Sequence, residues 1–112
     1  MLEKKISGSS IILCSIVRNC EKTLVAEIRT ITKALNNFNN IFYYIVESDS
    51  NDTTIQKLKF CKTEFKNFKF ISLGKLESKY SKRTERLAYC RNFYFEHIFP
   101  QYHGHMFLLL RH

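Results

Sequence analysis

Short apolar runs that alternate with helix-like segments constrain the fold of this chain most. The first run, from Ser10 to Val17 (SIILCSIV), is almost continuously apolar, which is typical of a strand covered on both faces. A second run spans residues 41–46 (IFYYIV), and shorter runs lie at 68–73 (FKFISL) and 106–110 (MFLLL). None approaches the roughly 20 residues that a membrane-spanning helix needs. The sequence therefore predicts four strands.

The segments between these runs carry helical signals. After the first run, apolar residues recur every three or four positions, at Leu24, Ile28, Ile31, Leu35 and Phe38. After the second run, Ser50 or Asp52 can cap a helix whose apolar stripe comprises Ile55, Leu58, Cys61 and Phe65. A third helix is predicted from Lys82 to Phe99, with Pro100 ending it. The predicted order of elements is βαβαβαβ.

This order predicts an α/β fold, a three-layer sandwich with a mostly parallel, Rossmann-like sheet. The length of 112 residues fits one domain. Ligands of such sheets bind at the carboxyl ends of the strands. That edge carries Arg18 and Asn19 after the first strand, residues 47–52 after the second and residues 74–83 after the third. The predicted binding edge is therefore polar.

The net charge of +8 is concentrated in residues 54–92, which contain eleven Lys or Arg and three Asp or Glu. Such an excess attracts nucleic acid, nucleotides or an anionic membrane surface, although a solvated helix face is the simpler explanation of the lysines. The sequence contains neither GxGxxG nor GxxxxGK[ST], which argues against an NAD-binding or P-loop enzyme. Side chains would then bind phosphate, and the candidates are Arg18, Lys82, Arg83 and Arg86.

Three ordered segments carry a family resemblance: residues 16–19 (IVRN), 46–54 (VESDSNDTT) and 86–92 (RLAYCRN). Together they resemble the nucleotide-sugar half of a GT-A-fold glycosyltransferase, and they are most similar to the mannosyltransferases of fungal capsule synthesis. The resemblance covers about residues 10–110. It implies a GT-A fold and a hexosyltransferase that transfers sugar from a GDP- or UDP-linked donor to an acceptor.

The resemblance also implies roles for individual residues. Arg18 and Asn19 after the first strand and Glu47 after the second, supported by Asp49, would bind the base and ribose. The donor's diphosphate and sugar would lie beside Arg83, Arg86, Arg91 and Asn92. Without the resemblance, the place of Glu47 and Asp49 at the end of a buried strand already suits hydrogen bonds from ribose hydroxyls or base N–H groups, although Asp49 is equally explained as a cap or turn residue. Arg91 and Asn92 are then explained as an exposed pair on a helix.

The sequence departs from this family after the fourth strand. The family holds a divalent metal, Mn or Mg, with an Asp-x-Asp pair, whereas here Arg111 and His112 follow Leu110. We therefore expect residues 1–112 to be a single nucleotide-sugar-binding domain, truncated before the metal ligands and inactive alone. We also expect a cytoplasmic location and self-association through an unprotected fourth strand. The alternatives are a small basic nucleic-acid-binding domain and a non-catalytic remnant.

Overall fold

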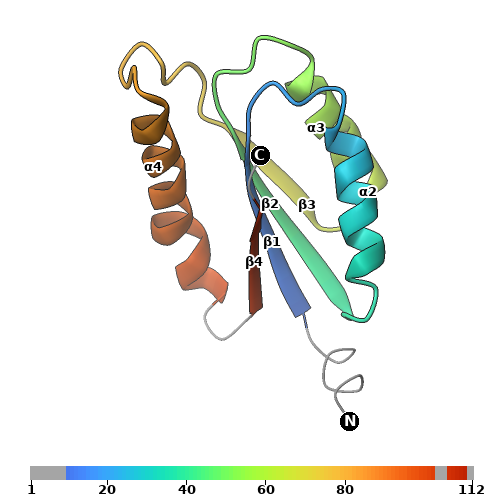
Figure 1. Ribbon diagram of the computed structural model, residues 1–112. Helices are drawn as coiled ribbons and strands as arrows, with labels where there is room; N and C mark the ends of the chain where they lie inside the picture. Colours follow the sequence, from blue (N-terminus) through green and yellow to red (C-terminus); the bar gives the residue numbers. More distant parts are fainter. Residues whose placement is uncertain (1–9, 103–105, 111–112) are drawn as a thin grey trace.

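The computed structural model describes residues 10–102 and 106–110, which fold around one sheet (Figure 1). Its strands are β1 (Ser10–Val17), β2 (Asn40–Glu47), β3 (Phe68–Ser72) and β4 (Met106–Leu110). Its helices are α2 (Leu24–Ala34), α3 (Thr54–Glu64) and α4 (Arg83–Phe93), and α4 is followed by the π-helical turn η1 (Tyr94–Ile98) and the 3-10 helix η2 (Phe99–Tyr102). All the strand pairs are parallel. The predicted α/β class and parallel sheet are confirmed.

Strand β1 lies inside the sheet, between β2 and β4, and the order across the sheet is β3-β2-β1-β4. The register pairs Ser10 with Asn40 and Val17 with Glu47. Residues 11–15 of β1 are all buried, which explains why this run shows no polar alternation. Dinucleotide-binding sheets begin with the same strand order, and their order reverses beside β1, where their ligands bind.

Helices α2 and α3 cover one face of the sheet (Figure 1). Leu24 and Ile28 of α2, predicted as part of its apolar stripe, are fully buried. Leu58 and Cys61 of α3 pack into the same cluster, which the sheet completes with residues including Leu13, Val17, Tyr43 and Ile45. The amphipathic stripes of the two helices therefore form one half of the core.

Helix α4 and the turn η1 cover the opposite face, so the molecule has three layers (Figure 1). Cys90, Tyr94 and Ile98 are buried there against Ile12 and Val46, among other sheet residues. The Tyr94 hydroxyl lies 2.9 Å from the Ser15 amide, which donates to it, and 2.6 Å from the Tyr44 carbonyl oxygen, to which it donates. This buried contact fixes η1 against β1 and β2.

The third helix differs from its prediction. Its α-helical part ends at Phe93, and the turn widens at Tyr94, whose hydroxyl is bound to the sheet backbone. Pro100 does not end the helical segment, because it lies within the 3-10 helix η2. Proline is tolerated in the first turn of a helix, where its missing N–H has no partner to lose.

The first helix is also shorter than its apolar stripe. Helix α2 ends at Ala34, so Leu35 and Phe38 lie beyond it and are only half-buried. The asparagine-rich segment 36–40 explains this end, since Asn side chains compete for backbone hydrogen bonds.

Strands β3 and β4 lie at the edges of the sheet formed by residues 10–102 and 106–110. The self-association expected through β4 stays a prediction. In this described part of the chain, no helix has the length and apolar character that crossing a bilayer requires.

Candidate functional site

The carboxyl ends of β1, β2 and β3 carry three sharply turning loops. Asn19, Asp49 and Gly74 each lie two residues beyond the end of their strand, and each has a positive φ, of 47°, 58° and 73° respectively. Asn, Asp and Gly are the residues that tolerate this left-handed conformation. A Cβ on Gly74 would meet no atom within 4 Å, so the backbone angle and not space requires glycine there.

Asn19 joins the loop after β1 to the loop after β2. Its backbone amide donates to the Ser50 hydroxyl at 3.0 Å, and its side-chain oxygen accepts from the Asn51 backbone amide at 2.7 Å. Beside it, the Glu21 carboxylate accepts hydrogen bonds from the Thr53 hydroxyl and amide, which lower the pKa of Glu21. The polar side chains of these loops are therefore largely bound to one another.

Glu47, at the end of β2, is buried with 1% of its surface exposed. Its Oε2 accepts a hydrogen bond from the Ser50 amide at 2.8 Å, and its Oε1 accepts one from the Ser72 hydroxyl at the end of β3. The carboxylate thus joins β2, its following loop and β3. It does not face open solvent, where a ribose hydroxyl would reach it.

Asp49 is also buried, with 2% exposed. Its amide donates to the Gly74 carbonyl at 2.8 Å, and its Oδ1 accepts from the Glu77 amide at 2.9 Å. Its Oδ2 has no hydrogen-bond partner in the described part of the chain and lies 4.0 Å from Nε of Arg86. Asp49 therefore anchors the loop after β3, and its carboxylate lies beside the Arg86 guanidinium.

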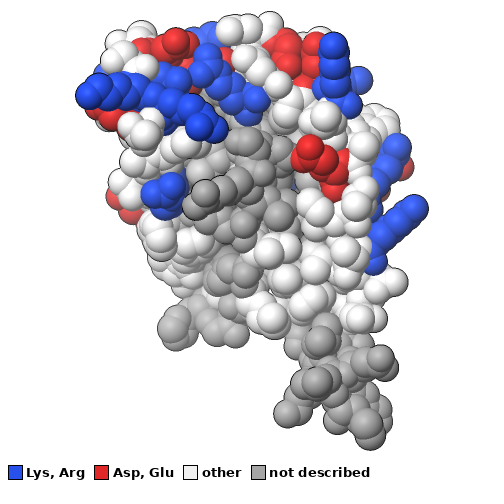
Figure 2. Space-filling model, in the orientation of Figure 1, with Lys and Arg blue, Asp and Glu red and all other residues white. Residues whose placement is uncertain are grey.

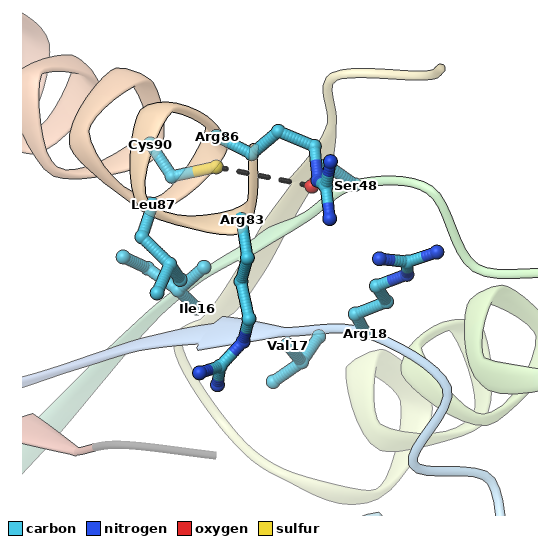
Figure 3. Close-up of a pocket in the computed structure, with 8 residues that line it drawn as sticks. All are labelled: Ile16, Val17, Arg18, Ser48, Arg83, Arg86, Leu87 and Cys90. Atoms are coloured by element: carbon cyan, nitrogen blue, oxygen red, sulfur yellow. Dashed lines mark hydrogen bonds between the residues drawn. The ribbon is translucent and has the colours of Figure 1, made fainter. Parts of the chain in front are cut away.

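A pocket of about 290 Å³ opens beside these loops, between the ends of β1 and β2 and the first turns of α4 (Figure 3). It is lined by Ile16, Val17, Arg18, Ser48, Arg83, Arg86, Leu87 and Cys90. Figure 3 shows Arg83 extending from α4 toward the end of β1 and Arg86 extending from the same helix toward Ser48. Three arginine residues from two segments of the chain thus line one pocket.

The three arginines differ in how firmly they are held. Arg86 is 7% exposed, and its Nη1 donates to the carbonyl oxygens of Tyr80 and Ser81 at 3.1 and 2.7 Å. Arg18 donates from Nε to the Asp49 carbonyl at 3.3 Å. Arg83 is exposed, and within residues 10–102 and 106–110 it forms no ion pair. Arg83 is therefore the side chain most available to a ligand.

The lining of the pocket combines three positively charged side chains with apolar ones. Helix α4 begins at Arg83, so its positive N-terminal end adds to the guanidinium charges. Basic side chains gather over the start of α4 and the loop before it, at the upper left of Figure 2. Among the other lining residues, burial raises the pKa of the Cys90 thiol, which donates to the Ser48 hydroxyl at 3.9 Å. This environment favours an anion such as phosphate.

The structure brings together some of the predicted site residues and separates others. Arg18, Arg83 and Arg86 line the pocket. Asn19, Glu47 and Asp49 instead belong to the hydrogen-bonded loops beside it. Arg91 and Asn92 are exposed farther along α4, outside the pocket. The predicted set therefore combines residues of the pocket, residues that support it and residues that lie away from it.

The predicted set of site residues did not include five residues that also line the pocket: Ile16, Val17, Ser48, Leu87 and Cys90. Side chains alternate between the faces of a strand, so Ser48 faces opposite to Glu47, toward α4. Helical spacing places Arg83, Arg86, Leu87 and Cys90 on one face of α4. These two periodicities would have identified Ser48, Leu87 and Cys90.

The pocket does not fit the divalent metal that the family resemblance implies. Its lining supplies three arginines and no carboxylate, and guanidinium groups repel a cation. The nearby Glu47 and Asp49 carboxylates are buried in contacts with the protein. In the residues that the structure describes, no group of three His, Cys, Asp or Glu side chains could hold a metal ion.

Comparisons with models of known protein families, with curated proteins and with solved structures give no match to this chain. The structure shows an α/β fold with an arginine-lined pocket at the carboxyl ends of β1 and β2.

Proposed function

We propose that the pocket binds the diphosphate of a nucleoside-diphosphate sugar, GDP- or UDP-linked, as the donor site of a GT-A-type glycosyltransferase. The single observation that carries the proposal is that Arg18, Arg83 and Arg86 all line one pocket at the carboxyl ends of β1 and β2. Guanidinium groups pair bidentately with phosphate oxygens. In sheets with this strand order, the same edge beside β1 binds nucleotides.

The proposal assigns different roles to the other residues that the resemblance implicates. Glu47 and Asp49 act as positioning residues, because their carboxylates already accept hydrogen bonds from the loops that shape the pocket. Asn19 acts in the same way by joining the first two loops. Arg91 and Asn92 are assigned no contact with the diphosphate, because they do not line the pocket.

The proposal is confined to donor binding. Transfer of the sugar also requires an acceptor site and a base that takes the acceptor's proton. The Glu47 and Asp49 carboxylates next to the pocket are buried and bound within the protein, so neither is assigned that role.

Nucleic-acid binding is the second candidate function, and it would use another surface. Lys57, Lys59, Lys62 and Lys66 are all exposed on or just after α3. Binding through such lysines would weaken steeply with salt, with a log–log slope near −0.9 for each phosphate neutralised. Binding of one nucleotide in the arginine pocket neutralises only that nucleotide's own phosphates, so its affinity should depend less on salt. Oligonucleotide titrations at two salt concentrations therefore separate the candidates.

The direct test compares two arginines of the same helix. Arg83→Ala removes a guanidinium from the pocket, whereas Arg91→Ala removes one from an exposed position outside it. A hydrogen bond to a charged group contributes about 1.5–3 kcal/mol, so we expect Arg83→Ala to weaken binding of GDP or UDP about tenfold or more. Arg91→Ala should change it less than about twofold. Calorimetric titration with GDP, UDP, GDP-mannose and UDP-glucose measures both effects.

Equal losses in the two variants would contradict the assignment of the pocket. Failure of the unmodified protein to bind any of the four nucleotides, together with tight oligonucleotide binding, would contradict the proposed function and favour the nucleic-acid alternative.

A further inference from the structure

Arg18 is already paired with a carboxylate of the protein. Its Nη2 lies 3.3 Å from Oε2 of Glu77, in the loop between β3 and α4. The two side chains are 36% and 58% exposed, so solvent and ligands reach the pair. The guanidinium that lines the pocket is thus partly neutralised by an internal anion.

The backbone of the Glu77 loop is fixed. The Glu77 amide donates to Asp49 Oδ1 at 2.9 Å, and the neighbouring Leu76 is buried in the core with 9% exposed. The Leu76 carbonyl accepts hydrogen bonds from the amides of Lys79 and Tyr80 at 3.0 and 2.7 Å. The loop therefore keeps Glu77 beside Arg18.

The Glu77 side chain, by contrast, can leave without disturbing the loop. Its exposed carboxylate pairs with Arg18, which lines the pocket, and the contacts that fix the loop use the backbone and Leu76. Exposed ion pairs contribute only about 0–1 kcal/mol, so a phosphate can displace this carboxylate.

We propose that Glu77 is an affinity-setting residue of the pocket, an internal anion that occupies Arg18 and competes with the phosphate of the ligand. The proposal rests on the proposed function, because it requires that an anion binds at Arg18. When a phosphate binds, Glu77 turns to solvent and the Arg18 guanidinium pairs with the phosphate oxygens. The net free energy of binding is the free energy with which the arginines bind phosphate, reduced by the free energy that the Arg18–Glu77 pair contributes in the unbound protein.

The test is a double-mutant cycle on Glu77 and Arg18, with inorganic pyrophosphate and GDP as probes. Glu77→Gln should raise the affinity of the protein for both probes about two- to fivefold, the value of an exposed ion pair. In the Arg18→Gln background, the same change should raise it by a clearly smaller factor, because the contact is already lost. If Glu77→Gln acted only by removing a repulsive charge at long range, it would raise the affinity by the same factor with Arg18 and in the Arg18→Gln variant.

A matched control removes a carboxylate from another exposed pair. Glu64 lies 3.6 Å from Arg29, and neither residue lines the arginine pocket. Glu64→Gln should leave the affinity for pyrophosphate within error of the unmodified protein, because the pair is remote and screened.

The outcomes separate this inference from the proposed function. An unchanged or lowered affinity in Glu77→Gln, or equal gains in both Arg18 backgrounds, overturns the role of Glu77 alone. Absence of pyrophosphate and GDP binding in every variant overturns the proposed function and this inference with it. Binding that is detected only in Glu77→Gln supports the inference most strongly.

Discussion

Glu47 is the residue on which the shape of the polar edge depends most directly. Both of its carboxylate oxygens accept hydrogen bonds, from the Ser50 amide and the Ser72 hydroxyl, and its side chain is buried. A buried group that loses a partner costs about 1–3 kcal/mol. Glu47 therefore connects the stability of the fold to the geometry of the pocket.

We predict that Glu47→Gln lowers the free energy of unfolding by about 1–3 kcal/mol, because the amide group that replaces one oxygen cannot accept a hydrogen bond. Urea denaturation measures this loss. Glu64→Gln, at an exposed ion pair on α3, is the matched control and should cost less than about 1 kcal/mol. An equal, small loss in the two variants would show that the Glu47 contacts contribute little.

The sequence predicted Glu47 and Asp49 as ligand contacts because an acidic residue after a buried strand has the same pattern in either role. The distinction depends on donors that are distant in the chain, such as Ser72 and the Glu77 amide. Arg83, predicted at the polar edge, and Arg86, predicted as a phosphate ligand, both line the pocket at the start of α4. Whether any of these residues contacts a nucleotide stays a prediction.

At the scale of the elements, sequence patterns predicted what local periodicity determines. The bounds of β1, Ser10–Val17, agree with its apolar run, and the stripes of α2 and α3 face the core. The π-helical turn at Tyr94 was not predicted, because it accompanies a hydroxyl contact with β1 and β2, about fifty or more residues earlier in the chain.

The N-terminus of α3 provides a pH-dependent prediction. The N-cap position of α3 is occupied by Thr53 and not by either predicted cap, Ser50 or Asp52. Asp52 lies just before it and accepts from the Thr54 amide at 2.9 Å and from the Glu21 amide at 3.3 Å, whereas Ser50 binds Asn19 instead. Partial burial alone would raise the pKa of Asp52, but these bonds and one from the Thr54 hydroxyl hold it below its ordinary value of 3.8.

Because the pKa of Asp52 is lowered on folding, its contribution to stability is complete above pH 3.8 and is lost as the pH falls through the lower, folded-state value. We predict that Asp52→Ala costs about 0.5–2 kcal/mol at pH 7, the usual value of a side-chain acceptor at a helix N-terminus, because the Thr54 amide at the start of α3 loses its acceptor. The difference in the free energy of unfolding between Asp52→Ala and the unmodified protein should shrink progressively below pH 3.8. Thermal denaturation between pH 7 and pH 2.5 measures this, and a constant difference across the range would contradict it.

At the scale of the whole molecule, the pocket exists because the strand order β3-β2-β1-β4 brings the end of β1 and the first turns of α4 together. Arg18 and Arg83, sixty-five positions apart in the chain, therefore line one cavity. The sequence predicted the edge but not the subset of residues that meets there, since that subset depends on how α4 packs across the sheet. Arg91 and Asn92 follow Arg83 in the same helix yet lie outside the pocket.

The account depends on where a nucleotide binds, and an NMR titration of the ¹⁵N-labelled protein with GDP and UDP tests this most directly. We expect the largest shifts at the backbone amides of Val17, Arg18, Ser48 and residues 83–87, which surround the pocket, and small shifts at Lys57 and Lys62 of α3. The largest shifts on α3, or no shifts at the pocket at millimolar nucleotide, a concentration on the order of a weak Kd, would contradict the account.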